Sequence, residues 1–160
     1  PWLAMHKLGH FFDIEIRPLV FFYSNNLLGY LPPLALGGVF ALFALPWMVL
    51  AVLAVPGTLL RGPSDSQRLA LLFSLGYLLP HIVIMAEPRF HLAVLPIIAS
   101  YAAFAWAERA QWGTLTGWRR WLAVALITLL IFNWAYALYS NADHLTALFG
   151  PDGNTTYFGY

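Results

Sequence analysis

The sequence predicts an all-α integral membrane protein, with about four transmembrane helices preceded by an amphipathic interfacial helix. Of its 160 residues, 61% are hydrophobic and only 9% are charged, whereas a soluble domain carries about a quarter charged residues. The apolar residues also form runs that approach the ~20 residues needed to cross a ~30 Å hydrocarbon core. Because so few charges cannot cover a surface that faces water, we expect lipid to be the surrounding solvent.

Composition also excludes several classes of function. The chain has no cysteine, which rules out disulfides, zinc–thiolate sites and thiol nucleophiles. Its formal net charge of +1 is too small for the basic footprint of a nucleic-acid-binding protein. The chain starts at Pro1 rather than at a methionine, so we expect it to be part of a longer protein.

Residues 1–29 are expected to form an amphipathic helix in the membrane interface, followed by a loop. At about 100° per residue, one stripe of this helix would carry four polar side chains, those of His6, His10, Asp13 and Arg17. The aromatic rings of Phe11 and Phe12 are expected at headgroup depth. Glu15 falls among the apolar side chains, so either the helix ends near Asp13, which we favour, or Glu15 points toward a protein partner.

The transmembrane domain is expected over residues 30–140, with spans at 30–55, 67–86, 90–106 and 121–139. Pro32 and Pro33 stand at the first turn of the first span, where a missing N–H costs little, and Pro56-Gly57 is expected to end it. Ser64 or Ser66 is a suitable N-cap for the second span. The Trp- and Arg-rich residues 108–120 are expected to form a loop, and residues 141–160 an extramembrane tail.

The distribution of basic residues predicts the orientation of the spans. Four spans place the 56–66 and 108–120 loops on one side, which carries Arg61, Arg68, Arg109, Arg119 and Arg120. The other side carries Lys7, Arg17 and Arg89. The positive-inside rule therefore predicts that the arginine-rich loops are cytoplasmic and that the turn 87–89 and the tail are extracytoplasmic.

The charged turn between the second and third spans is the candidate binding site. Glu87 and Arg89 flank Pro88 there, and two interpretations stay open: an ion pair that anchors the hairpin at the interface, or a phosphate site. A guanidinium binds phosphate bidentately and is not deprotonated, and a helix that begins at Phe90 would add its N-terminal N–H groups. His91 would be either an interface residue or a second phosphate contact.

Two further polar residues stand within the apolar runs. His81 follows Pro80, and a proline inside a helix leaves the carbonyl four residues earlier, that of Gly76, without its donor. The imidazole would either bond to this carbonyl or face a ligand, because a histidine at this depth requires protein or water beside it. Asn133 is expected to form a hydrogen bond between helices.

The polar stripe of the first helix has two readings. His6 and His10 are spaced i, i+4 with Asp13 on the same side, which suits a metal ion or a pigment magnesium. Such a stripe is more often simply the wet face of an interfacial helix. Asp13 and Glu15 would point to opposite sides of a helix, so they do not form a convincing catalytic pair.

The run Glu87-Pro88-Arg89-Phe90-His91-Leu92-Ala93-Val94-Leu95-Pro96, followed by the small-residue run 97–103, resembles a late motif of the multi-spanning GT-C glycosyltransferases. The branch that it resembles is the bacterial one related to protein mannosyltransferases and aminoarabinose lipid A transferases. The order of elements is similar over about residues 1–140, as in the C-terminal half of such an enzyme. Ala93 departs from the pattern, because many members have proline there.

The resemblance implies a glycosyltransferase that takes a sugar from a polyprenyl phosphate at the extracytoplasmic face of a bacterial plasma membrane. Arg89 would contact the lipid phosphate, and Glu87, His91 and His81 would belong to the same substrate site. The catalytic acidic residue of the family lies in the first extracytoplasmic loop and has no counterpart in this chain. The general base would therefore come from the missing N-terminal half, and a requirement for a divalent metal stays open.

The alternative is a non-catalytic role. The chain would then be a structural subunit of a larger membrane complex, with its Trp and Phe surfaces against lipid or a bound pigment. His6, His10 or His81 would ligate the pigment. The lack of a complete catalytic set in these residues favours this reading.

Overall fold

The computed structural model describes residues 2–14, 16, 19, 21, 31–60, 64–83 and 92–149, and within these ranges every regular element is a helix. The elements are α1 (Trp2–Phe11), α3 (Pro33–Leu59), α4 (Asp65–Val83), α5 (Leu95–Ala107), the 3-10 helix η2 (Arg109–Thr114), α6 (Gly117–Ser140) and α7 (Ala142–Phe149). The predicted all-α class is confirmed for this part of the chain.

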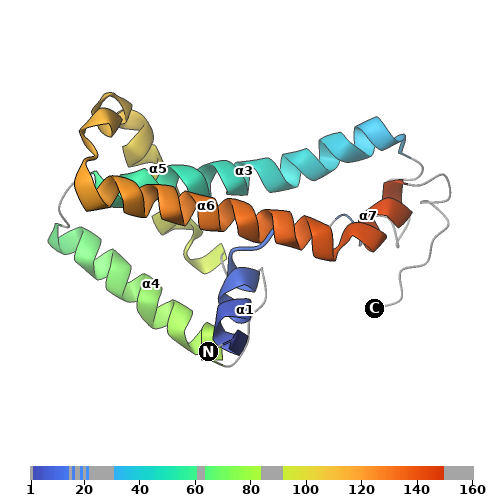
Figure 1. Cartoon of the computed structure of the whole chain (residues 1–160), viewed down its shortest axis with the longest axis horizontal. Coiled ribbons are helices and arrows are strands. Elements are labelled where there is room, and N and C mark those ends of the chain that lie inside the picture. Colours follow the sequence, from blue (N-terminus) through green and yellow to red (C-terminus); the bar gives the residue numbers. More distant parts are fainter. Residues whose placement is uncertain are drawn as a thin grey trace.

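The two long helices α3 and α6 run antiparallel beside each other (Figure 1). They contain 27 and 24 residues, and by length and composition both can cross a membrane. Only 17% of the apolar window of each helix is buried within the chain, so most of this hydrocarbon surface faces outward. A helix that is apolar all round suits a lipid environment, whereas a helix at a water-facing surface carries a polar face.

The other two expected spans do not reach the same combination of length and apolarity. α5 is an apolar helix of 13 residues, about 20 Å long at ~1.5 Å per residue, and this is less than a ~30 Å hydrocarbon core. α4 has 19 residues and begins with the polar turn 65–68. Two spans therefore have structural support, and the third and fourth stay a prediction.

The prolines near the two ends of α3 have different effects. Pro33 is the first residue of the helix, after Pro32 at the N-cap, and this confirms the predicted start. Pro56 and Gly57 do not end the helix, which continues to Leu59. The predicted end is wrong because the last turn is held by packing against α5, a contact that local sequence does not reveal.

Gly57 marks the closest approach of α3 and α5. A Cβ atom at this position would lie 2.9 Å from the carbonyl carbon of Tyr101, nearer still to its oxygen, and 3.4 Å from the Cβ atom of Ala105. The two backbones meet here only because residue 57 has no side chain. Small residues serve the same purpose at helix contacts in membranes.

α4 begins with a reciprocal pair of hydrogen bonds. The Ser64 N–H donates to Gln67 Oε1 at 3.0 Å, and the Gln67 N–H donates to Ser64 Oγ at 3.3 Å. This arrangement is a capping box, which satisfies two backbone donors at the helix start. Of the two candidate N-caps, the structure selects Ser64.

α5 begins later than the sequence pattern predicts. Leu92 and Ala93 form a short 3-10 turn, and the α-helix starts at Leu95. Pro96 then occupies the first turn, where backbone N–H groups have no helical acceptor, so the missing N–H of proline costs little. A helix that began at residue 90 would instead place the proline ring against the Leu92 carbonyl. The helix start expected directly after Arg89 is therefore corrected to Leu95.

In contrast to α5, α6 starts earlier than expected, and a further helix follows it. The helix begins at Gly117, which has a φ of +57°, so only 115–116 separate it from η2. The expected loop 108–120 is thus largely helical. α7 occupies the start of the expected tail, and Asn141 Nδ2 links the two helices by donating to the Ala137 carbonyl at 2.8 Å.

Two hydrogen bonds gather several helix ends at one end of the α3–α6 pair. Arg119 Nη1 donates to the Leu59 carbonyl at 3.4 Å, and the Tyr101 hydroxyl donates to the Gln67 carbonyl at 3.4 Å. The connections after α3 and after α5 consequently lie at the same end (Figure 1). This agrees with the order of four spans, while the face of a membrane that this end meets stays a prediction.

We expect Gly57→Ala to lower the free energy of unfolding by about 1–3 kcal/mol, because the added methyl group forces the α3 and α5 backbones apart. Gly38→Ala is the matched control, since a Cβ atom there meets nothing within 4 Å, and it should be neutral or stabilising by about 0.5–1 kcal/mol. Denaturant unfolding of the detergent-purified chain, followed by circular dichroism, measures both. Equal stabilities of the two variants would contradict the close approach.

Candidate functional site

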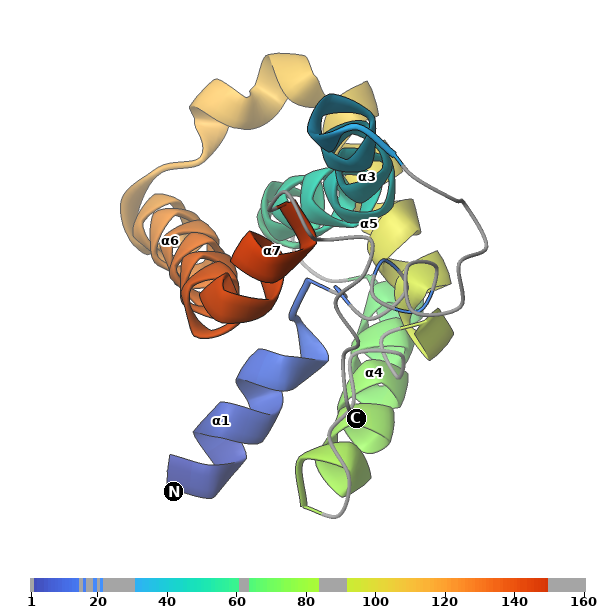
Figure 2. The same ribbon diagram turned by 90° about the vertical axis from the view of Figure 1, so that its right-hand side faces the viewer.

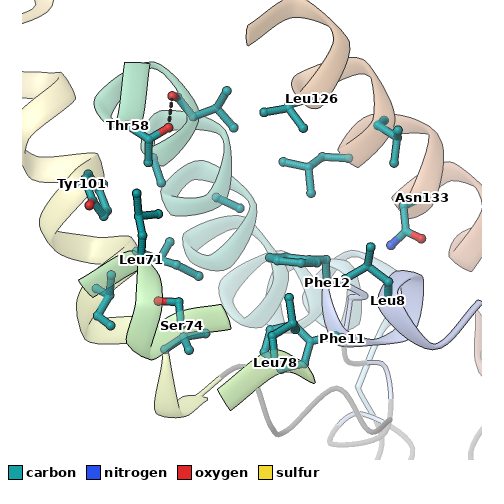
Figure 3. A pocket seen from close by; sticks show the side chains of 18 of the residues that line it. Leu8, Phe11, Phe12, Thr58, Leu71, Ser74, Leu78, Tyr101, Leu126 and Asn133 are labelled. Atoms are coloured by element: carbon teal, nitrogen blue, oxygen red, sulfur yellow. Dashed lines mark hydrogen bonds between the residues drawn. The ribbon is translucent and has the colours of Figure 1, made fainter. Parts of the chain in front are cut away.

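A cavity of about 370 Å³ lies between α1, α3, α4, α5 and α6 (Figure 3). Its volume lies within the range of ligand pockets, roughly 300–1,000 Å³. α1 supplies Leu8 and Phe11 to the wall, Phe12 follows directly after it, and α4 supplies Leu71 and Leu78. The lining is almost entirely hydrocarbon, so the cavity suits an apolar ligand.

The polar side chains in the lining all donate their hydrogen bonds to backbone carbonyls. Thr58 Oγ1 donates to the Val55 carbonyl at 2.8 Å, as Figure 3 shows. Ser74 Oγ donates to the Ala70 carbonyl at 2.8 Å, and the bond from the Tyr101 hydroxyl is described above. These donors are therefore already used, and no charged side chain among the described residues lines the cavity, so a charged group buried here would have no counter-charge in the wall.

The fourth polar side chain of the lining, Asn133, joins α6 to α1. Its Nδ2 donates to the Gly9 carbonyl at 3.0 Å, which confirms the predicted hydrogen bond between helices. The indole Nε1 of the next residue, Trp134, donates to the Phe12 carbonyl at 2.9 Å. Side chains of α6 thus bond to carbonyl groups at and just after the C-terminal end of α1, where backbone carbonyls lack helical partners. The Gly9 carbonyl also accepts the Phe12 N–H at 3.1 Å.

α1 packs against other helices of the chain. The helix lies between α6 and α4 (Figure 2), and the Phe11 side chain is only 2% exposed. The Phe12 ring stacks on Trp47 of α3, with ring centroids 6.4 Å apart. Both phenylalanines therefore pack against the protein, and their expected headgroup depth stays a prediction.

α1 ends close to Asp13, as predicted. α1 stops at Phe11, and Asp13 Oδ1 accepts the N–H of Ile14 at 2.7 Å. The carboxylate also lies 3.5 Å from His10 Nδ1. Glu15 lies outside the described residues.

The described part of the chain holds no group of three His, Asp or Glu side chains arranged as metal ligands. The predicted stripe is tested only in part, because the side chain of His6 is not described. His10 and Asp13 contact each other, and Arg17 lies outside the described residues. A metal or pigment site on α1 therefore stays a prediction.

The predicted phosphate site lies outside the described residues. Glu87, Arg89 and His91 belong to the range 84–91, and the His81 side chain is not described although its backbone belongs to α4. The helices on both sides of this range contribute to the apolar cavity, through Leu78 near the end of α4 and through Val94 just before α5. Described residues on both sides of the range 84–91 thus line the cavity.

Sequence reasoning did not find the cavity. Its walls come from five helices, and each lining residue is an ordinary apolar or small residue of a membrane helix. Small residues in the lining, such as Gly9, Ala51 and Ala54, are the one local signal of space between helices. No known protein family, curated protein or solved structure matches the chain.

We expect Trp134→Phe to loosen α1, because it removes the donor to the Phe12 carbonyl and keeps most of the ring. One hydrogen bond contributes about 1 kcal/mol, so amide exchange in α1 should become roughly fivefold faster. Trp118→Phe is the control, since Trp118 is exposed on the same helix. Hydrogen–deuterium exchange measured by mass spectrometry reports both variants, and unchanged exchange in α1 for Trp134→Phe would contradict the docking described above.

Proposed function

We propose that this chain is the membrane-embedded, donor-binding portion of a polyprenyl-phosphate-dependent glycosyltransferase. The observation that carries the proposal is the apolar cavity, whose polar side chains are bonded to the backbone. A polyprenyl chain has no polar atoms, so it fills such a cavity without leaving a group unpaired. The cavity would hold part of the hydrocarbon tail, and the sugar and phosphate would lie outside it.

The charged turn would supply the phosphate contact. Since Leu78 and Val94 line the cavity, a tail held there can place its phosphate near the segment that joins α4 to α5. The Arg89 guanidinium would grip the phosphate and stabilise it as the leaving group. Glu87, His91 and His81 would complete the polar side of the site.

We also propose the number and orientation of membrane spans that the sequence predicts. α3, α4, α5 and α6 would be four spans of a multi-pass protein in a bacterial plasma membrane, with the turn 87–89 at the extracytoplasmic face. The general base would come from a part of the enzyme outside these residues, so the present chain would bind the donor without turning it over.

The exposed aromatic surface favours a second candidate function. Large parts of Trp118, Trp121, Phe132 and Tyr139 on α6 are exposed, from 67% to 79% of each residue. Such a surface suits contact with further membrane helices, either of the same enzyme or of a larger complex in which this chain is a structural or pigment-contacting subunit. A visible absorption band of the purified chain would favour the pigment-contacting form of this alternative.

We expect Ser74→Phe to fill the cavity and to lower the affinity for a polyprenyl phosphate at least about fivefold, because overpacking costs about 1–3 kcal/mol. Ser100→Phe is a closely matched control. Both serines donate to the carbonyl four residues earlier, at 2.8 and 2.7 Å, but Ser100 is exposed and lies outside the cavity lining. Binding of a polyprenyl phosphate to the detergent-purified chain, measured by native mass spectrometry, tests the pair. Equal losses in both variants would exclude the cavity as the tail site.

We expect Arg89→Ala to abolish the preference for a polyprenyl phosphate over the polyprenol of the same length, while the polyprenol still binds. The comparison isolates the phosphate, because the two lipids share their tail. Competition between the two lipids on the purified variant measures the preference. An unchanged preference, or normal turnover of the variant within the complete enzyme, would remove Arg89 from the proposed site.

A further inference from the structure

A second cavity, of about 410 Å³, lies where η2 and the start of α6 meet α3. Its apolar walls are Val52 and Leu53 of α3 and Val124 and Ile127 of α6. It shares no lining residue with the first cavity. Ala51, Ala54 and Val55 face the first cavity while Val52, Leu53 and Pro56 face the second, so the two cavities lie on different sides of α3.

The segment that borders this cavity is held in place by specific hydrogen bonds. Trp112 Nε1 donates to the Ala105 carbonyl at 2.9 Å, and the Leu115 N–H donates to the Trp112 carbonyl at 3.2 Å. The bond from Arg119 to the Leu59 carbonyl also holds the start of α6 against the end of α3. Trp112 and Leu115 themselves line the cavity, so its rim is part of the fold.

The three arginines of this connection have different surroundings. Arg109 donates to the Trp106 carbonyl at 3.2 Å and lies over the Trp106 ring, 5.4 Å from its centroid. Arg119 is engaged with Leu59. Arg120 is the one that lines the cavity, and it forms no hydrogen bond or ion pair with the residues that the structure describes. No acidic residue lines the cavity, so this cation has no counter-charge there.

We propose that this cavity binds an anionic phospholipid, with the phosphate on Arg120 and one acyl chain along the α3 and α6 walls. The guanidinium stays charged at any relevant pH and can donate two parallel hydrogen bonds to a phosphate. Basic pockets between membrane helices bind anionic headgroups in this way. The exposed Trp118 and Trp121 beside Arg120 suit headgroup depth. The proposal does not depend on the glycosyltransferase assignment, because it uses a different cavity and a different arginine.

A competition between two lipids with identical acyl chains tests the proposal. The full chain, purified in a neutral detergent, is mixed with equal amounts of phosphatidylglycerol and phosphatidylcholine, and native mass spectrometry counts the retained lipids. We expect the chain to prefer phosphatidylglycerol and Arg120→Gln to lower the phosphatidylglycerol-to-phosphatidylcholine ratio about tenfold. Arg120→Lys should keep part of the preference, because it keeps the charge without the planar fork. Arg109→Gln, a change in the same connection but outside the cavity lining, should alter the ratio less than about threefold.

A second pair of variants tests the acyl-chain wall without changing any charge. Val124→Trp should reduce the retention of phosphatidylglycerol, because it fills the cavity, whereas Leu122→Trp, outside the lining, should not. The absence of a preference in the unaltered chain, equal effects of Arg120→Gln and Arg109→Gln, or equal effects of the two tryptophan variants would each overturn the proposal. Binding of a polyprenyl phosphate should be unchanged in Arg120→Gln, so failure of one proposal is distinguishable from failure of the other.

Discussion

The structure depends on one constraint, namely that polar groups surrounded by hydrocarbon must find their hydrogen-bond partners inside the protein. Thr58, Ser74 and Ser100 meet it by donating to carbonyls three or four residues earlier in their own helices. Asn133 and Trp134 meet it between helices, by donating to carbonyls of the α1 region. Because these donors turn toward the backbone, both the outer surface of the long helices and the wall of the first cavity present carbon atoms. The apolar character of the candidate site is thus a consequence of the same rule that stabilises the helices.

The positions without a side chain decide how closely the helices approach. A Cβ atom at Gly9 would lie 2.7 Å from Asn133 Oδ1, so any larger residue here would displace the Asn133 side chain that bonds α6 to α1. At Gly57 the missing side chain lets α3 and α5 approach closely. The residues next to both glycines, Leu8 and Thr58, line the first cavity, so these points of approach lie at its border.

The central place of α3 gives the two proposed lipid sites a common support. One side of its C-terminal half faces the cavity bounded by α1, α4, α5 and α6, and another side faces the cavity under η2. The first would receive the uncharged tail of a lipid-linked donor. The second contains an arginine without a counter-charge among its lining residues and would receive a membrane phospholipid. The two sites would differ in chemistry because only the second has a cation in its own wall.

The sequence alone determined what depends on contacts within a turn or two. The apolar composition predicted helices in lipid, Pro32-Pro33 predicted the start of α3, and the charged break predicted that α1 ends near Asp13. These features depend on backbone donors and side chains that are neighbours along the chain. The passage of α3 through Gly57, the burial of Phe11, α7 and both cavities were decided by the tertiary structure. Each of these depends on residues from separate helices coming together, and the spacing of residues along one helix does not encode which surface of another helix it will meet.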